Sequence, residues 1–207
     1  MRKSILSASA LAWAVLATIG CVAAAQRPAP PAAGPGSAGK AYTSADVQFM
    51  TGMIAHHAQA VLMAGWAPSH GASASLRAMC ERIVVGQGDE IVLMQRWLRD
   101  RHEMVPDGNA AHDMMPGMDH HLMPGMLTPQ QLMQLDSARG GEFDRLFLTF
   151  MIQHHMGAIT MVNELFGSQG GGEEEIVFRF ASDVYADQTT EIARMNRMLD
   201  ALKRSPS

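Results

Sequence analysis

The chain has 207 residues and carries 16 Lys and Arg against 20 Asp and Glu, a formal net charge of −4. This mild acidity argues against nucleic acid as a partner and suits cationic ligands. The compositional anomaly is 18 methionines against seven Phe and two Tyr; core packing accounts for some of these flexible side chains, but not for their clustering.

Residues 1–25 resemble a secretory signal peptide. Two basic residues precede an apolar run over residues 5–19, and small residues at 23–25 form the cleavage end. The run is shorter than the roughly 20 apolar residues that cross a bilayer, and no later segment approaches that length. We expect cleavage before Gln26, with lipid attachment at Cys21 as the alternative. Either route predicts a periplasmic or secreted protein with no transmembrane segment in the mature chain.

The rest of the chain divides into a linker and a helical domain. Residues 26–42 are rich in Pro, Ala and Gly and predict a flexible linker. Helical signals fill most of the chain after this linker, which predicts one bundle domain from 43 to 204. It is expected to contain hairpin one (43–103), a Met/His-rich loop (104–127) and hairpin two (128–204).

Capping residues indicate where the helices begin. Thr43 or Ser44 can cap the first helix, and Ser73 can cap the second. After the loop, Thr128 followed by Pro129 is typical of a new helix start, because proline is well tolerated in the first turn. A glycine pair further on is expected to break or bend that helix.

Two stretches of the chain occur twice. Phe49–His57 returns as Phe147–His155, with Phe, Thr, Met, Ile and the His pair in register. Gln87–Leu98 returns as Gln188–Leu199, with Gln, Glu, Ile, Met, Arg and Leu in register. A whole helical hairpin is therefore duplicated. Two such hairpins predict an all-α, up-and-down four-helix bundle.

Helical spacing predicts that both histidines of each pair face the core. At about 100° per residue they fall on the wide apolar half of their helix, beside one methionine. The candidate metal ligands in the bundle are Met53, His56, His57, Met151, His154 and His155. The second and fourth helices are expected to turn a further set of side chains toward them, namely Gln87, Glu90, Met94, Gln188, Glu191 and Met195.

This combination of side chains favours copper. Imidazole suits copper, zinc, iron and nickel, whereas the soft thioether selects copper, above all Cu(I). A carboxylate commonly accepts a hydrogen bond from the second nitrogen of a ligating histidine, which is the role expected of Glu90 and Glu191. The alternative is a buried network of His, Glu and Gln hydrogen bonds without metal.

The loop carries a second candidate ligand set, in which Met-Pro-Gly-Met occurs twice. Pro and Gly do not support core packing here, so we expect these methionines to be exposed, where packing gives them no reason to accumulate. Interleaved Met and His favour Cu(I) over zinc, with a disordered tether of biased composition as the alternative. The candidate ligands are His112, Met114, Met115, Met118, His120, His121, Met123 and Met126.

Several of these motifs together resemble a known family. They are His56-His57 followed by Ala60, the Gln87, Glu90 and Met94 pattern, the Met-Pro-Gly-Met-Leu-Thr-Pro loop, and Phe143-Asp144-Arg145-Leu146-Phe147 through His154-His155. Over about Ser44 to Leu202 they closely resemble domain-of-unknown-function family 305, which includes CopM-like copper proteins. The resemblance implies a ferritin-like four-helix bundle, an extracytoplasmic location and copper binding through Met and His. No helix carries the Glu-x-x-His pair of di-iron enzymes.

The leading hypothesis is an exported copper-binding protein that buffers or transports copper or confers resistance to it. Cu(I) is the preferred ion, Cu(II) is the second to consider, and copper-handling proteins are candidate partners. No catalytic residue is indicated. The alternatives are a copper-dependent oxidase or another metalloenzyme, and a metal-free helical scaffold that binds a partner.

Overall fold

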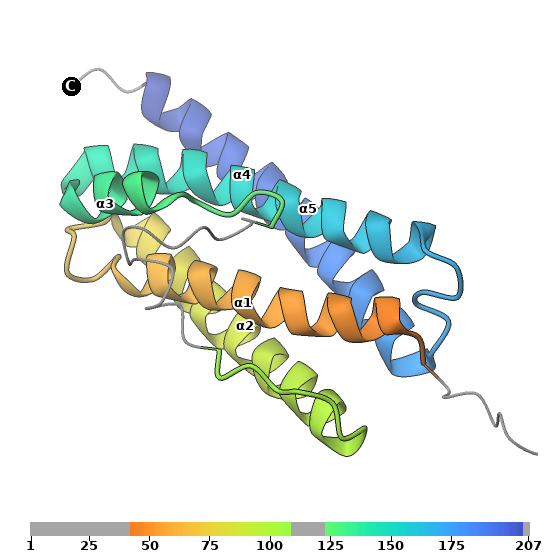
Figure 1. Ribbon diagram of the computed structural model, residues 1–207. Helices are drawn as coiled ribbons and strands as arrows, with labels where there is room; N and C mark the ends of the chain where they lie inside the picture. The colour runs from red at the N-terminus through yellow and green to blue at the C-terminus, as the bar shows by residue number, and fades with distance from the viewer. Residues whose placement is uncertain (1–41, 109–122, 205–207) are drawn as a thin grey trace, which may run out of the picture. The chain divides into compact units, whose positions relative to one another are not determined.

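The computed structural model describes residues 42–108 and 123–204 (Figure 1). The predicted signal peptide, nearly all of the predicted linker and most of the Met/His-rich loop lie outside these residues. In chain order the helices are α1 (Ser44–Gly65), α2 (Ala74–Asp100), α3 (Pro129–Ser137), α4 (Gly140–Gly167) and α5 (Glu175–Arg204).

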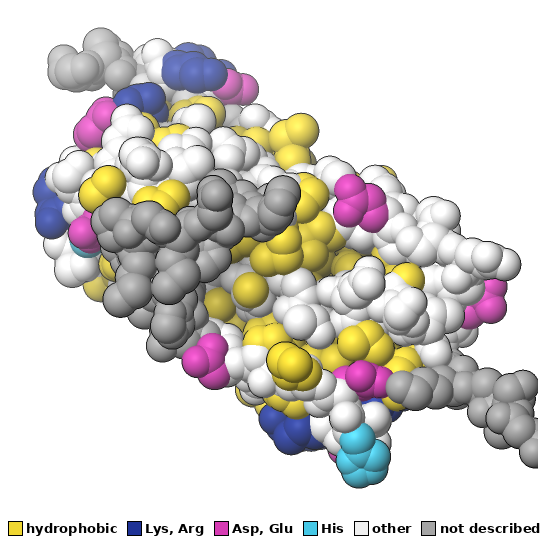
Figure 2. All heavy atoms as spheres, viewed as in Figure 1, with side chains coloured by type: hydrophobic (Ala, Val, Ile, Leu, Met, Phe, Trp, Pro, Cys, Tyr) yellow, Lys and Arg dark blue, Asp and Glu magenta, His cyan; other side chains and the backbone are white. Residues whose placement is uncertain are grey.

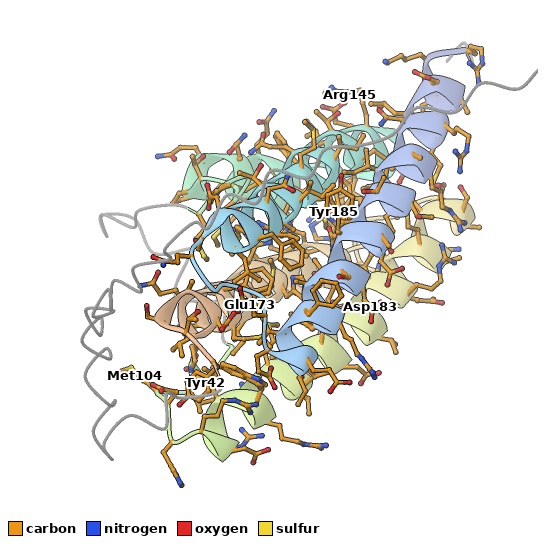
Figure 3. The ribbon with its side chains drawn as sticks, turned by 90° about the vertical axis from the view of Figure 1, so that its right-hand side faces the viewer. Tyr42, Met104, Arg145, Glu173, Asp183 and Tyr185 are labelled. Carbon is orange, nitrogen blue, oxygen red and sulfur yellow. The ribbon has the colours of Figure 1, made fainter. Side chains whose placement is uncertain are left out.

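The four long helices form two antiparallel hairpins that pack together. α1 packs along α2, α4 packs along α5, and α1 also contacts α4 (Figure 1). In the view turned by 90°, α5 passes in front of α4 and α2 (Figure 3). The prediction of an all-α, up-and-down four-helix bundle is therefore confirmed. The short helix α3 is an addition to it, packed on α4 after the Thr128–Pro129 start.

Side chains that the sequence indicates as caps begin three of these helices. Thr43 and Asp46 form a capping box at α1, Ser73 caps α2, and Thr128 forms a second capping box at α3. Asp46 also accepts a hydrogen bond of 2.7 Å from the backbone N–H of Gly172, in the turn between α4 and α5. One buried carboxylate thus joins the start of the first hairpin to the turn of the second.

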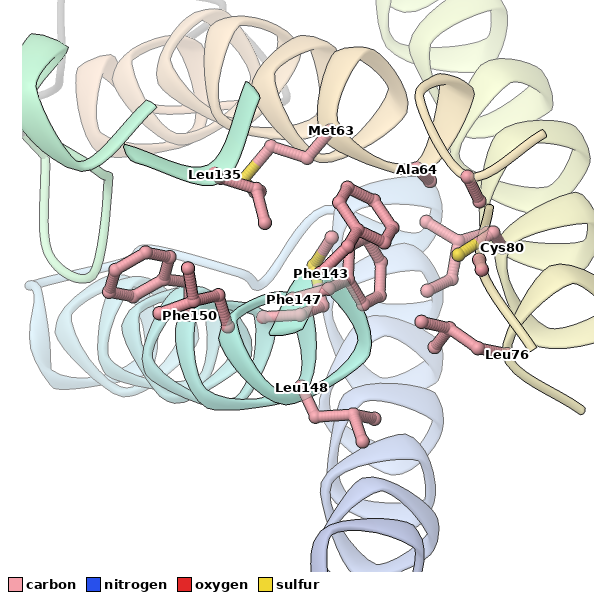
Figure 4. Close-up of a cluster of buried hydrophobic side chains, with 14 of the residues drawn as sticks. Met63, Ala64, Leu76, Cys80, Leu135, Phe143, Phe147, Leu148 and Phe150 are labelled. Atoms are coloured by element: carbon pink, nitrogen blue, oxygen red, sulfur yellow. The ribbon is translucent and has the colours of Figure 1, made fainter. Parts of the chain in front are cut away.

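A polar layer divides the core into two hydrophobic clusters. One cluster contains Leu76, Phe143 and Phe147 and appears in Figure 4. The other contains Phe49 and Val184. On each long helix the repeated His, Gln or Glu residues fall between the positions that enter the two clusters. The duplication therefore places its polar residues at one level of the bundle.

Cys80 lies in the first of these clusters and is buried. Burial raises the pKa of its thiol to about 12, with the charge of Asp144 as the next cause. The thiolate needed for metal binding is therefore strongly disfavoured, in agreement with the packing role that its repeat partner Ala181 suggests. Across the described residues, no helix has both the length and the hydropathy that a membrane span requires.

Candidate metal centre

The four repeated histidines lie together in the polar layer. The ring centroids of His56 and His154 are 3.8 Å apart, with 37° between the ring planes. His57 lies 6.4 Å from His56 and His155 lies 6.3 Å from His154, centroid to centroid. At most 1% of any of these four residues is exposed. α1 and α4 therefore meet through two closely packed, tilted imidazoles, with one more imidazole on either side. We call these four residues the histidine layer.

Hydrogen-bond partners define the tautomers of two of these rings. His56 donates its Nε2–H to the backbone carbonyl of Pro124 at 3.0 Å, because a carbonyl can only accept. His155 donates its Nε2–H to a carboxylate oxygen of Glu191 at 2.6 Å. In the neutral form both rings therefore carry their lone pair on Nδ1. This is the arrangement in which an outer partner orients a histidine for metal binding.

His57 and Glu90 form a similar pair in the first hairpin. His57 Nε2 lies 2.8 Å from a carboxylate oxygen of Glu90, at ion-pair distance but without the angle of a good hydrogen bond. The side chains of Glu90 and Glu191 are 23% and 26% exposed, so each links a buried imidazole to the surface. The two hairpins present the same His–Glu pair at equivalent positions.

Most of the other ring nitrogens in the layer have no partner. Within residues 42–108 and 123–204, no hydrogen bond reaches Nδ1 of His56, His57 or His155, or either ring nitrogen of His154. The backbone of His56 approaches the His154 ring but lacks hydrogen-bond geometry. A buried polar atom without a partner costs about 1–3 kcal/mol. Ring nitrogens without a partner among the described residues are free to bind a metal ion.

Burial favours the neutral, metal-binding form of three of these imidazoles, those of His56, His154 and His155. Burial, followed by the charge of neighbouring His57, lowers the pKa of His56 to about 3. Burial and the adjacent histidines hold the pKa of His154 well below its ordinary value. Burial also lowers the pKa of His155, against the opposing effect of Glu191. At neutral pH copper would not have to displace a proton from these rings.

Thioethers lie on both sides of the histidine layer. Met53, Met94, Met151 and Met195 are all fully buried. Met53 and Met94, from the first hairpin, belong to the cluster that contains Phe49. Met151 and Met195, from the second, belong to the cluster shown in Figure 4. Each hairpin therefore places its two methionines in a different cluster, on a different side of the layer.

A pocket of about 330 Å³ opens between α2 and α5, and we call it the α2–α5 pocket. Glu90 and Glu191 line it together with Gln87 and Gln188, which are 4% and 3% exposed. The side-chain amide of Gln87 and the amide oxygen of Gln188 find no partner among the described residues. The Gln and Glu side chains predicted to face the histidines therefore line a solvent-accessible pocket beside the His–Glu pairs.

Charged residues that sequence reasoning missed also line the α2–α5 pocket. Arg82 and Arg194 contribute guanidinium groups, and Asp187 contributes a third carboxylate. Burial, and then the charges of Glu90 and Glu191, raise the pKa of Asp187. Gly86 stands where the repeat has Asp187, so only this difference between the copies hints at the extra acid.

The segment 123–127, at the end of the Met/His-rich loop, covers the opposite side of the layer. Its Pro124 carbonyl binds His56, and the backbone of Leu127 exchanges two hydrogen bonds, of 2.7 and 3.2 Å, with the side-chain amide of Gln59. Gly157 allows the close approach, because a Cβ there would collide with the backbone of Pro124 and Gly125. Sequence reasoning missed this contact. The sequence feature that points to it is a difference between the two copies, Gly157 standing where the first copy has Gln59.

The two predicted loop ligands that the structure describes, Met123 and Met126, are less exposed than expected, whereas Met104 at the start of the loop is 86% exposed. Met126 is only 7% exposed and Met123 is half-buried. The expectation of exposed side chains was wrong for Met126, because the Pro-Gly turn lies directly on α4 at Gly157. The other predicted loop ligands lie outside the described residues, namely His112, Met114, Met115, Met118, His120 and His121.

The histidine layer is not a complete site of nitrogen and oxygen ligands. In the part of the chain that the structure describes, no three His, Cys, Asp or Glu side chains converge on one point. Buried methionines stand beside the layer on the same helices. Imidazole together with thioether fits the donors that copper accepts, whereas zinc sites use thiolate, imidazole and carboxylate.

Fold and layer together define a duplicated helical-hairpin bundle with a buried histidine layer. The model of the family described as Domain of unknown function (DUF305) matches residues 46–199, and the chain belongs to this family. The resemblance drawn from the sequence motifs is confirmed. A comparison with curated proteins finds no match.

Solved structures with the same fold include metal-bound proteins. A DUF305 fragment from Deinococcus radiodurans is 24% identical, covers 77% of this chain and 98% of its own, and has a TM-score of 0.65. CopM in its Cu(II)-bound form is 27% identical, with coverage of 75% and 96% and a TM-score of 0.61. CopM in its Cu(I)-bound form is 25% identical, with the same coverage and a TM-score of 0.57.

Proposed function

We propose that this chain is an exported copper-binding protein that holds Cu(I) in its histidine layer. The observation that carries the proposal is the set of buried imidazole nitrogens that no described group satisfies. Three of the four rings also have lowered pKa values because of burial, so they are neutral ligands at the pH of most extracytoplasmic compartments. Buffering, transport or resistance are the roles that such a site serves.

Copper is favoured over other ions by the mixture of donors. Neutral imidazole alone would accept several divalent metals, but fully buried thioethers of Met53 and Met151 flank the layer, and thioether selects Cu(I). CopM, which shares this fold, has been solved with Cu(I) and with Cu(II). Cu(II) is therefore the second ion of the proposal.

Each group of side chains has a distinct part in this proposal. The histidine layer with Met53 and Met151 supplies the ligands. Glu90 and Glu191 orient the outer rings. Gln87, Gln188, Met94 and Met195 surround them. The loop set from His112 to Met126 is proposed as a second, outer group of copper ligands.

The proposed location is the periplasm or the exterior of the cell. It is supported by the signal-like residues 1–25, and by the use of Met and His rather than thiolates as soft ligands. A thioether cannot form the disulfides that would consume cysteine ligands in such a compartment. Copper-handling proteins are the proposed partners.

The proposal is tested by titrating the protein with Cu(I) in competition with a chromophoric chelator. Replacement of His154 by Leu removes two unsatisfied nitrogens at similar volume and is expected to weaken binding at the layer by about tenfold or more. The control is His102→Asn, at an exposed position with φ of 57°, a conformation that Asn tolerates. The proposal fails if both variants bind as the parent does.

A second candidate function is a copper-dependent oxidase of Cu(I) or another small reductant. It is favoured by the α2–α5 pocket, which gives solvent access to the His–Glu pairs. Catalytic oxidation by the copper-loaded protein above the rate of free copper would support it. Stoichiometric binding without turnover would favour storage or transport instead.

A further inference from the structure

The two copies of the histidine helix differ at one position that faces the groove between α1 and α4. The repeat aligns Phe49, Thr51 and Met53 of α1 with identical residues of α4, but Gly52 stands where α4 has Phe150. Phe150 is 8% exposed and packs in the cluster shown in Figure 4. The first copy therefore lacks a large apolar side chain at the equivalent place.

Two thioethers occupy the space that the missing ring leaves. A Cβ built on Gly52 would lie 3.0 Å from Sδ of Met123 and 3.4 Å from the terminal methyl carbon of Met161. Met123 comes from the end of the Met/His-rich loop and Met161 from α4, so the two side chains converge over Gly52 from different segments. The contacts bring one loop methionine and one bundle methionine to a single point.

The same place is hollow and opens to solvent. A groove of about 210 Å³ is lined by Gly52, Met123 and Met161, with Gln48 and Glu164 exposed at its rim. Hydrophobic side chains gather on this face of the molecule between α1 and α4 (Figure 2). Met123 is half-buried and Met161 is 7% exposed, and both side chains border this accessible groove.

Packing alone does not explain this arrangement. A glycine inside a helix costs about 1 kcal/mol relative to alanine, and a filled core would favour the phenylalanine of the other copy. Met63, the repeat partner of Met161, shares its buried cluster with Phe150 and is fully buried. The first copy has thus exchanged an apolar contact for an open groove beside soft sulfur donors.

We propose that Met123 and Met161 form a thioether site for Cu(I) in the groove over Gly52, separate from the histidine layer. Soft thioethers select Cu(I) among the ions of an oxidising compartment. Glu164 at the rim supplies a negative charge that favours a cation. Met123 belongs to the end of the Met/His-rich loop and Met161 to α4, so the site takes its two ligands from different segments of the chain.

The inference depends on the proposed function only in the choice of metal. The groove is built from residues outside the histidine layer, so either site can bind when the other has been removed. Silver(I) is a suitable probe, because it is a soft monovalent ion without redox chemistry in air. The number of bound ions per chain is measured by native mass spectrometry, and the affinity by competition titration.

Three substitutions in the full chain test the site. Met161→Leu and Met123→Leu each remove one sulfur at similar volume, and Gly52→Phe restores the residue of the other copy and fills the groove while every sulfur stays in place. Each variant is expected to bind one silver ion fewer than the parent, or to bind that ion with an affinity about tenfold lower or more. Met63→Leu is the matched control, the same change at the repeat partner of Met161, and is expected to bind as the parent does.

The outcomes separate the two sites. If Met161→Leu loses an ion that His154→Leu retains, the thioether site is present whether or not the histidine layer binds. If His154→Leu loses an ion while Met161→Leu and Gly52→Phe bind like the parent, the proposed function stands and the thioether site is overturned. Equal losses in Met161→Leu and Met63→Leu would also overturn it, because the effect would then follow core packing.

Discussion

The imidazole rings of His56 and His154 lie in contact at a centroid distance of 3.8 Å, tilted by 37°, although they are almost a hundred residues apart in the chain. Their helices are copies of one hairpin, and the contact is made where the two copies meet. Two buried, neutral imidazoles in contact give little hydrophobic stabilisation, and polar atoms of both find no partner among the described residues. Such a contact is understandable if the layer serves a ligand and not the stability of the metal-free fold.

Replacement of His154 by Leu should stabilise the metal-free protein. The substitution removes two ring nitrogens that have no partner in the described structure and inserts an apolar side chain of similar size. The free energy of unfolding is expected to rise by about 1–3 kcal/mol, measured by urea unfolding in the presence of a strong chelator. A loss of stability would indicate that the ring is a satisfied structural residue.

Acid should destabilise the metal-free protein through the same rings. The pKa of His56 is lowered from 6.5 to about 3, so its ring stays neutral in the folded state while the unfolded chain takes up a proton below pH 6.5. The contribution of this ring to the free energy of unfolding is fully present above pH 6.5. It is lost as the pH falls toward 3, by about 1.4 kcal/mol per pH unit for each such histidine. Urea unfolding midpoints measured at several pH values from about 7.5 to about 4, a range that spans the ordinary pKa of histidine, test this.

The comparison with His154→Leu isolates the histidine contribution to this pH dependence. Carboxylates titrate in both proteins, so the difference between parent and variant belongs mainly to His154, whose pKa burial also lowers. The variant is expected to lose stability less steeply on acidification. Parallel curves for the two proteins would be inconsistent with a buried, neutral ring at this position.

Glu191→Gln should weaken copper binding more than it weakens the fold. The carboxylate accepts the Nε2–H of His155 and orients its Nδ1 toward the layer. Loss of such a partner typically lowers metal affinity by about 10–100-fold, measurable by Cu(I) competition. Glu142→Gln is the control, since Glu142 is half-exposed and pairs only with Arg145 in the described structure. Equal affinities in both variants would exclude the orienting role.

Gly157→Ala should detach the 123–127 segment from the histidine layer. A Cβ there meets the backbone of Pro124 and Gly125, which cannot move aside as a flexible side chain could. We expect a loss of about 1–3 kcal/mol in unfolding free energy. Gly88→Ala provides the opposite case, because a Cβ at Gly88 meets nothing within 4 Å inside a helix and should stabilise by about 0.5–1 kcal/mol. Equal effects would show that the close approach has no energetic role.

The internal repeat of the sequence was enough to predict much of this bundle. Conservation of His-His and of the Gln, Glu and Met pattern between the two halves predicted the hairpins, and helical spacing predicted the inward rings. Caps such as Thr43 and Ser73 were visible because their function depends on the side chain itself. Those features result from local physical chemistry and from periodicity.

Features that depend on differences between the halves were not predicted. The Pro124 carbonyl that binds His56 is a backbone atom, and every residue has one. Gly52 and Gly157 align with Phe150 and Gln59 of the other copy. The reason for each glycine becomes clear only in the structure, where a segment distant in sequence packs against it. Sequence comparison of the halves finds such positions, but it does not identify the segment that fills the space.

The most direct test of the histidine layer is a long-range ¹H–¹⁵N spectrum of the ring nitrogens, recorded without metal and with one equivalent of Cu(I). His70 is an internal reference, because its ring is hydrogen-bonded at 2.9 Å to the backbone carbonyl of Asp136, away from the layer. We predict that the Nδ1 resonances of the layer histidines shift on loading while those of His70 stay in place. Bound copper with unchanged resonances for His56, His57, His154 and His155 would contradict a copper site in the layer.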